Sequence, residues 1–307
     1  MYSKYTKPLA DLMRALRIIF HGYADDTQLL KSINPDSIPD QVQAVKCIED
    51  STDKIGSCMH ANKLQLNTNK TECLVIGLPQ QRKKLVFDSI MIGDDNIKIS
   101  HSVRNLGLMM DSQLDMSVHV QYVCKMCYYH IRNIGKIRRY LTHDATKSLV
   151  QATVISRLDY CDSCLSSVRK KQIKKFQRVQ NSAARLIAKL PKHCHITPVL
   201  KGLHWLPIKQ RIDFKLLLIT YKSLNNIGPD YLKELLIVNH QTRQLRSKTR
   251  GDLYQPAYKL QTCGKRAFAV NAPRLWNQLP PYIKKTESVQ VFKKHLKTHL
   301  FNIAYPD

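Results

Sequence analysis

Two adjacent carboxylates, Asp25 and Asp26, lie between two short apolar runs in the stretch IIFHGYADDTQLL, residues 18–30. Apolar runs on both sides of a short polar stretch are typical of a β-hairpin. Carboxylate oxygens are the ligands that hard cations such as Mg²⁺ prefer, and a hairpin tip can hold them at the edge of a cleft. The pair is therefore either an ordinary turn or one part of a metal site.

A second Asp-Asp pair, in IMIGDDNIKI at residues 90–99, shows that the dipeptide alone is not a catalytic signal. Gly, Asp and Asn accept tight-turn dihedral angles, so turn chemistry alone explains this second pair. The first pair differs in its frame, because a strand-like run reaches Tyr23 and the small residue Ala24 precedes both acids.

The sequence around these acids predicts a mixed α and β arrangement in the first hundred residues. Apolar residues recur at close to helical spacing in residues 39–67, and Pro39 suits the first turn of that helix. We expect a further helix over residues 7–16, a hairpin near 18–30, and strands within 71–77 and 85–99.

From about Ser117 the sequence becomes helical, and residues 169–190 give the clearest pattern. One stripe of this segment is apolar, with residues recurring at steps of three and four: Ile173, Phe176, Val179, Ala183, Ile187 and Leu190. Other helices are predicted over 119–141, 143–165 and 204–224, with a proline-broken stretch and a terminal helix in 265–301.

The Tyr-x-Asp-Asp hairpin at residues 23–26 resembles the metal-binding motif of reverse transcriptases. Further segments follow in the same order and cover nearly the whole chain: 5–30, 62–77, 103–120, 156–165, 179–190, 195–224 and 266–283. Together they resemble the carboxy-terminal part of the polyprotein of non-LTR (LINE-type, Jockey-like) retrotransposons.

The resemblance implies an α+β fold in three regions. Residues 1–115 would be a partial palm, in which the hairpin and a small sheet pack with helices. Residues 116–192 would form a helical, thumb-like region, and residues 193–307 a helical, basic carboxy-terminal region.

The resemblance also implies roles for four residues. Nucleotidyl transfer uses two divalent cations about 4 Å apart, for which Asp25 and Asp26 would be ligands, Asp25 the more direct one. Lys70 matches a palm lysine that helps to protonate the departing pyrophosphate; alternatively it is a solvated lysine at the start of a strand. Tyr23 would lie beside the primer terminus, or it simply packs on the hairpin.

The chain departs from the family pattern in the residues that complete the metal site. Polymerases of this kind take another aspartate from an earlier palm strand, but the only acid before Ala24 is Asp11, in the helix that leads into the hairpin. A Gly-x-x-x-Gln-Gly-type element, fingers and an endonuclease domain are also missing. We therefore expect a truncated copy that holds Mg²⁺ weakly or not at all and does not polymerise alone. A separate chain could supply the missing palm and fingers.

The charge predicts an anionic partner. There are 49 Lys and Arg residues against 23 Asp and Glu, a net charge of +26, which favours nucleic acid. No apolar run is long enough for a membrane helix. The predicted partners are an RNA template and an RNA–DNA duplex. The contacts would come from a helix with no acid between Val168 and Lys192: Lys171, Lys174, Lys175, Arg178, Arg185 and Lys189.

A second basic cluster, Arg243, Arg246, Lys248 and Arg250, could also contact phosphates or act as a nuclear address. Each cluster could instead be a solvated surface. The alternative function is a noncatalytic, basic nucleic-acid-binding protein derived from a retroelement, and a nonfunctional relic is a third reading. Nine cysteines and an amino terminus without an apolar signal core favour the nucleus or cytoplasm.

Other groups of cysteine and histidine residues give weaker evidence for a metal site. Cys124 and Cys127, and Cys161 and Cys164, form two C-x-x-C pairs, but they are too far apart for paired zinc knuckles and lie in helical sequence. We expect them to be buried thiols. His193 and His195 lie in a predicted loop, and Trp205 is expected to anchor the next helix.

Overall fold

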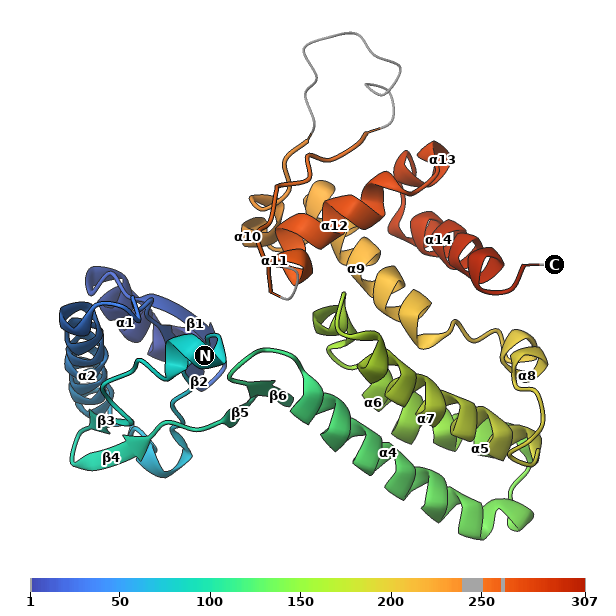
Figure 1. Cartoon of the computed structure of the whole chain (residues 1–307), viewed down its shortest axis with the longest axis horizontal. Coiled ribbons are helices and arrows are strands. Elements are labelled where there is room, and N and C mark those ends of the chain that lie inside the picture. Colours follow the sequence, from blue (N-terminus) through green and yellow to red (C-terminus); the bar gives the residue numbers. More distant parts are fainter. Residues whose placement is uncertain (1, 239–250, 261–262, 307) are drawn as a thin grey trace, which may run out of the picture. The chain divides into compact units, whose positions relative to one another are not determined.

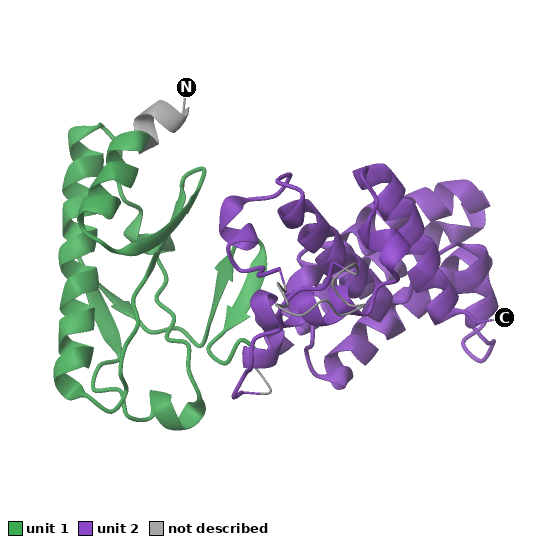
Figure 2. Cartoon of the chain, turned by 90° about the horizontal axis from the view of Figure 1, so that it is seen from above, with its two compact units in different colours: residues 1–114 green, residues 115–307 purple. Residues whose placement is uncertain are grey.

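The computed structural model describes residues 2–238, 251–260 and 263–306 of the chain. It has two compact units, residues 1–114 and 115–307, shown in different colours in Figure 2. The predicted division was 1–115, 116–192 and 193–307. The first boundary lies next to the predicted one, and residues 115–307 form one unit.

Unit 1 is built of helices and three separate hairpins (Figure 1). Each hairpin is a two-stranded antiparallel sheet, so the described strands of this unit form no larger sheet. The elements are α1 (Tyr2–Ala15), β1 (Ile19–Tyr23), β2 (Asp26–Leu30), α2 (Ile38–Ala61), η1 (Thr68–Lys70), α3 (Pro79–Arg82), β3 (Ser89–Ile92), β4 (Asp95–Lys98), β5 (Ser102–Asn105) and β6 (Leu108–Asp111).

The sequence predicts several of these elements correctly. The hairpin at β1 and β2 is confirmed, as is the helix that begins near Pro39. Ser37 caps that helix by accepting a hydrogen bond from the Asp40 backbone N–H. The strand predicted over residues 71–77 is wrong, because this segment makes only one isolated bridge, between Cys73 and Ile99.

Unit 1 has a sparse apolar core. Among its described residues, six apolar side chains are buried: Met13, Ile18, Ala44, Ile55, Ile90 and Ile92. Met13, Ile18 and Ile55 form one cluster, against which partly buried neighbours such as Phe20 and Leu29 pack. A hollow of about 1160 Å³ lies inside the unit, lined by residues of α2, the hairpins and the segment near residues 64–77. The unit therefore holds its helices and hairpins around an incompletely filled interior.

Unit 2 is helical in its described part (Figure 1). The elements are α4 (Ser117–Ile137), η2 (Arg138–Tyr140), α5 (His143–Val150), the π-helical η3 (Gln151–Ile155), α6 (Ser156–Asp159), η4 (Asp162–Leu165), α7 (Lys170–Ala188), α8 (Thr197–Gly202), α9 (Ile208–Leu224), α10 (Asp230–Lys233), α11 (Cys263–Arg266), α12 (Phe268–Asn277), α13 (Pro281–Lys284) and α14 (Val289–Ala304). None of the described helices is long and apolar enough to cross a membrane.

The core of unit 2 is well filled. Tyr221 on α9 stacks on Phe292 of α14 with ring centroids 4.1 Å apart, and Trp276 of α12 is buried beside them. The expectation that Trp205 anchors a helix fits its burial and the hydrogen bond that its carbonyl accepts from Tyr305. Unit 2 thus provides helices that are packed on a core and whose outer faces can carry charge.

Candidate nucleic-acid interface and acidic hairpin

The acidic hairpin places both carboxylates at its tip. Asp25 is the second residue of a two-residue turn, and Asp26 begins β2 opposite Tyr23. Both aspartates are exposed. The strands behind them pack through Phe20 and Leu29 on the core cluster of unit 1, so the tip stands on an ordered sheet of two strands.

The turn requires an unusual backbone conformation. Ala24, its first residue, has φ of 53°, which lies in the left-handed region. A residue with a Cβ in this region costs roughly 1 kcal/mol relative to glycine. The tip is therefore held by its neighbours rather than by local preference.

The predicted residues Asp25, Asp26 and Lys70 line the same hollow of unit 1. Lys70 ends the short helix η1 and is exposed, directly before the extended segment 71–77. Tyr23 is 68% exposed and therefore does not pack into the core of the unit. The structure thus brings the two acids and the lysine to the border of one concave surface.

The donor atoms at this border do not fit a site for two cations. Among the described residues, no group of three or more His, Cys, Asp or Glu side chains could hold a metal ion. Two exposed carboxylates provide too few ligands, because a pair of divalent cations must share several oxygens. A complete centre would need at least one more carboxylate beside Asp25 and Asp26.

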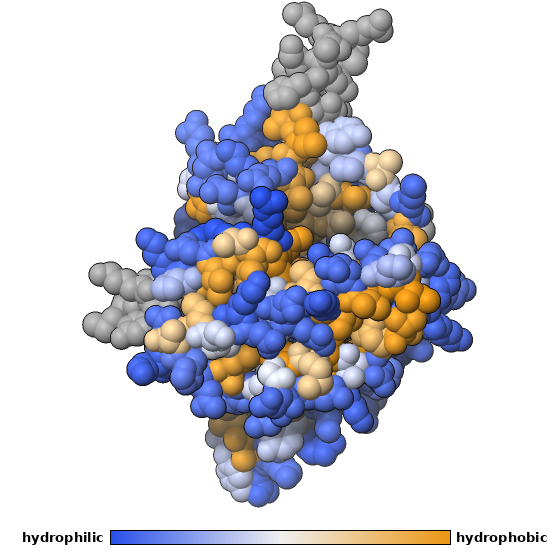
Figure 3. Space-filling view, turned by 90° about the vertical axis from the view of Figure 1, so that its left-hand side faces the viewer, coloured by the Kyte–Doolittle hydropathy of each residue, from blue (hydrophilic) through white to orange (hydrophobic). Residues whose placement is uncertain are grey.

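Apolar side chains around the hollow remain exposed. Ile19 and Ile76 are exposed by 65% and 46%, and Leu30 by 42%. On the face drawn in Figure 3, apolar side chains reach the surface in patches between hydrophilic ones. One polar link spans two hairpins, since Gln28 Nε2 donates to Asn105 Oδ1 over 2.6 Å. Exposed apolar patches of this kind indicate surfaces that another segment or chain can cover.

Helix α7 carries a basic face. Its predicted basic residues recur at steps of three, four and seven, which places them on one side of the helix. Lys171, Lys174, Arg178 and Lys189 are exposed, and Lys175 is half-buried. Phe176 and Val179 are buried on the other side, which confirms the predicted apolar stripe.

Arg185 differs from the other basic residues of α7. Its guanidinium donates to the Cys194 carbonyl over 3.2 Å, and its Nε is buried. It therefore ties α7 to the following loop and is less free to contact a phosphate than predicted.

The remaining cations of α7 are not neutralised within the described structure. None of the ion pairs between described residues involves a residue of α7. Arg243, Arg246, Lys248 and Arg250 of the second predicted cluster lie outside the described residues.

Of the two cysteines of α4, Cys127 is buried and Cys124 is half-buried. Burial raises the pKa of Cys124 to about 11 and that of Cys127 to about 12, so both stay protonated near neutral pH. Burial also raises the pKa values of Cys161 and Cys164. The prediction of buried thiols is confirmed for Cys127. Cys124 and Cys161 are half-buried, and the prediction is wrong for Cys164, which is exposed.

A buried carboxylate group in unit 2 is not evident from the sequence. Arg211 Nη1 donates to both carboxylate oxygens of Asp159 over 2.8 Å, and Asp162 is 4% exposed. Burial, and then the charge of Asp159, raise the pKa of Asp162 to about 7. The sequence shows the motif Asp-Tyr-Cys-Asp, but its burial depends on contacts with α9, which lies far along the chain.

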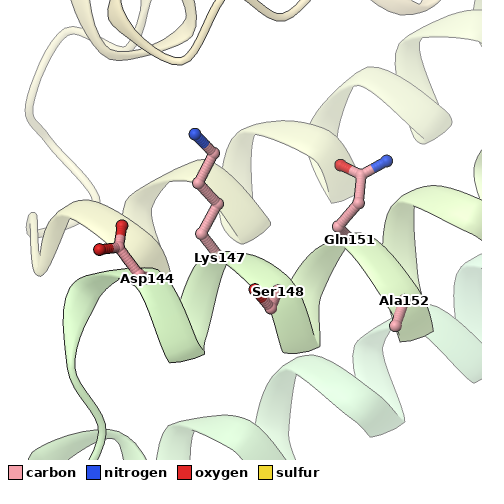
Figure 4. A pocket seen from close by; sticks show the side chains of 5 residues that line it. All are labelled: Asp144, Lys147, Ser148, Gln151 and Ala152. Atoms are coloured by element: carbon pink, nitrogen blue, oxygen red, sulfur yellow. The ribbon is translucent and has the colours of Figure 1, made fainter.

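A smaller hollow in unit 2, of about 510 Å³, is lined by five residues of α5 and the π-helical η3 that follows it. Figure 4 shows Asp144, Lys147 and Gln151 projecting from the same side of the helix without converging on one point. Such an open surface offers no chemistry that the other sites lack.

No family model matches the chain, and neither does any curated protein or any solved structure.

Proposed function

We propose that the chain is part of an RNA-directed DNA polymerase of the non-LTR retroelement type. Unit 1 would then contribute to the palm, with Asp25 and Asp26 as two of the carboxylates of its catalytic centre. The observation that carries this proposal is the Tyr-Ala-Asp-Asp hairpin, whose two acids stand exposed at the border of a hollow that Lys70 also lines.

The sparse core of unit 1 supports an incomplete palm. Its hairpins leave a hollow of about 1160 Å³ among apolar side chains, so further strands would have apolar surface to bury. We propose that these strands, and a further carboxylate, come from a separate segment or chain. This polypeptide alone would then not join nucleotides.

The basic face of α7 would hold an RNA–DNA duplex. Lysine and arginine side chains contact phosphates regardless of sequence, so such a face positions a duplex without reading it. The exposed residues Lys171, Lys174 and Arg178 span about 10 Å of helix and face solvent with no acid of the described structure paired to them.

A second candidate function is a noncatalytic nucleic-acid-binding protein. It is favoured by the contrast between the two units, because the apolar side of α7 is buried through Phe176, Val179 and Ile187 whereas the acidic hairpin borders an open hollow. In this case the basic face would act without any contribution from Asp25.

Primer extension tests the proposal. The purified chain is given a labelled primer on an RNA template with Mg²⁺ and nucleotides, together with the variants Asp25→Ala and Asp94→Ala. We expect the duplex to bind in all three proteins and no primer to be extended. Robust extension that Asp25→Ala abolishes and Asp94→Ala leaves intact would show a complete centre and refute the claim that the chain is inactive alone.

A second experiment distinguishes the two candidate functions: strands from the upstream part of such a polymerase are added as a second polypeptide. Extension that then depends on Asp25 but not on Asp94 supports the polymerase. Unchanged duplex binding with no extension under any of these conditions supports the noncatalytic protein.

A further inference from the structure

The outer face of α4 combines tyrosines with cations. Six side chains fall on one side of this helix, because they recur at steps of three and four: Tyr122, Lys125, Tyr128, Tyr129, Arg132 and Lys136. The opposite side holds Val120, Val123, Cys127 and Ile134, which are buried in unit 2. The two faces are cleanly separated, so the six outer residues are not needed to fill the core.

The aromatic rings of this face are exposed. Tyr122, Tyr128 and Tyr129 are exposed by 37%, 40% and 56%. The ring of His130 contacts that of Tyr129 edge-on, with centroids 5.4 Å apart, which restricts the position of the tyrosine ring. Large planar groups held at the surface in this way can stack against other flat groups.

The cations of this face have no acidic neighbour along the chain. Lys125, Arg132 and Lys136 are exposed, and no Asp or Glu occurs between Asp115 and Asp144. None of these three cations forms an ion pair with another described residue. The face therefore carries positive charge that attracts a polyanion.

A further exposed pair of a cation and a tyrosine follows α4 directly in the chain. The Arg139 guanidinium lies over the Tyr140 ring, 4.6 Å from its centroid, and Tyr140 is 72% exposed. From Tyr122 to Lys136 the face extends over about 21 Å, which is long enough for several nucleotides of an extended strand.

A comparison with helix α7 indicates which kind of nucleic acid suits the outer face of α4. Its basic face has no aromatic residue, since the only ring on this helix, Phe176, is buried. A face with cations alone suits phosphates of a duplex, whose bases are stacked and inaccessible. A face on which tyrosines alternate with cations suits a single strand, because its bases are free to stack on the rings.

We propose that the outer face of α4 binds single-stranded nucleic acid, with the tyrosines stacking on bases and the cations contacting phosphates. This inference rests on the proposed function for the class of ligand, and it adds a second surface with a different preference. The charge complementarity and the exposed rings do not specify a base sequence, so binding should tolerate any sequence.

The test measures affinities for a labelled RNA single strand and for an RNA–DNA duplex by fluorescence anisotropy at several salt concentrations. One variant changes Tyr122, Tyr128 and Tyr129 to Leu, and a second changes the same residues to Phe, which keeps the rings. The matched control changes three exposed tyrosines on other elements of unit 2, namely Tyr231, Tyr254 and Tyr282, to Leu. A fourth variant changes Lys125, Arg132 and Lys136 to Gln.

We expect the Leu variant of α4 to weaken single-strand binding by at least about tenfold, with little effect on the duplex and an unchanged salt dependence. The Phe variant and the control should bind as the unaltered chain does. The Gln variant should flatten the salt dependence for the single strand by about 0.7 for each phosphate that its side chains no longer neutralise. This readout remains informative if the Leu variant does not fold.

The inference is overturned if the Leu variant of α4 and the control bind the single strand equally well. It is also overturned if the Gln variant keeps the full salt dependence. Failure of the proposed function is distinguishable, because the unaltered chain would then bind neither the single strand nor the duplex at low salt.

Discussion

Asp25 and Asp94 occupy the same position in two hairpins, as the second residue of a two-residue turn whose flanking pairs are Tyr23 with Asp26 and Ile92 with Asp95. In each turn the preceding residue has a left-handed φ, 53° at Ala24 and 58° at Gly93. Turn geometry therefore does not distinguish the two acid pairs. In the described part of unit 1, the pair that lines the hollow is Asp25 with Asp26.

Exchanging Ala and Gly at the residue before each acid pair should affect the stability of unit 1 differently in the two hairpins. Gly93→Ala should lower the free energy of unfolding of unit 1 by about 1 kcal/mol, because it places a Cβ at a left-handed φ. Ala24→Gly should not lower it, since the strain relieved offsets the added freedom of the unfolded chain. Chemical denaturation followed by far-ultraviolet circular dichroism measures both. Equal losses from the two exchanges would contradict the turn assignment.

Arg138 caps the carboxy-terminal end of α7. Its guanidinium donates to the carbonyls of Leu186 and Ile187 at 2.9 and 2.8 Å, and the side chain is buried. Arg138→Gln should lower the free energy of unfolding of unit 2 by about 2–4 kcal/mol, because it leaves those carbonyls without their charged donor. The neighbouring exposed change Arg139→Gln is the control and should cost at most about 1 kcal/mol, since it loses only the contact with the Tyr140 ring.

These changes in stability can be followed by the fluorescence of Trp205 and Trp276, which both lie in unit 2. If Arg138→Gln and Arg139→Gln are equally stable, the proposed capping role of Arg138 is wrong.

Asp162 should make the stability of unit 2 depend on pH. Its pKa is raised to about 7 by burial and then by the charge of Asp159, while Lys215 and Arg211 partly offset these effects. Because the folded chain holds this proton more tightly than the unfolded chain, the stabilisation is present in acid and lost as pH rises from about 4 to about 7.

Asp162→Asn should therefore stabilise the protein at pH 8, by up to about 4 kcal/mol, and this advantage should vanish near pH 4. Asp159→Asn is the comparison, since it removes the charge that helps to raise the pKa of Asp162 and should reduce the loss of stability between pH 4 and pH 8 that Asp162 causes. Denaturation curves at pH 4, 6 and 8 compare the variants. An advantage of Asp162→Asn that does not change with pH would rule out a titrating buried carboxyl.

The sequence predicts those elements whose signals are local. Residues 18–30 form the expected hairpin, and the apolar stripe through Phe176 packs as its spacing indicates. The strand predicted at 71–77 is wrong because a strand needs a partner, and the segment pairs only at Cys73. The hairpin of β5 and β6 was missed, since its short strands include Arg104 and Asn105 and carry little alternation.

In the candidate sites, too, the sequence predicts the features that have a local signal and misses those that depend on distant contacts. The sequence correctly predicts that Phe176 packs inward on α7, and helical spacing places Lys171 and Arg178 on the opposite face. The attachment of Arg185 to Cys194 depends on a loop conformation that no local pattern specifies. The burial of Asp162 likewise depends on helix α9, so neither could be predicted from neighbouring residues.

We propose that α7 holds an RNA–DNA duplex through its phosphates. The most direct measurement is the salt dependence of duplex affinity for the unaltered chain and for the triple variant Lys171→Gln, Lys174→Gln and Arg178→Gln. The control is a triple variant of exposed lysines on another part of unit 2, Lys285, Lys294 and Lys297, each changed to Gln. We predict that the α7 variant weakens binding and reduces the slope of log affinity against log salt by between about 2 and 3, while the control changes neither. An equal effect of the two variants, or no duplex binding at low salt by the unaltered chain, would contradict the account.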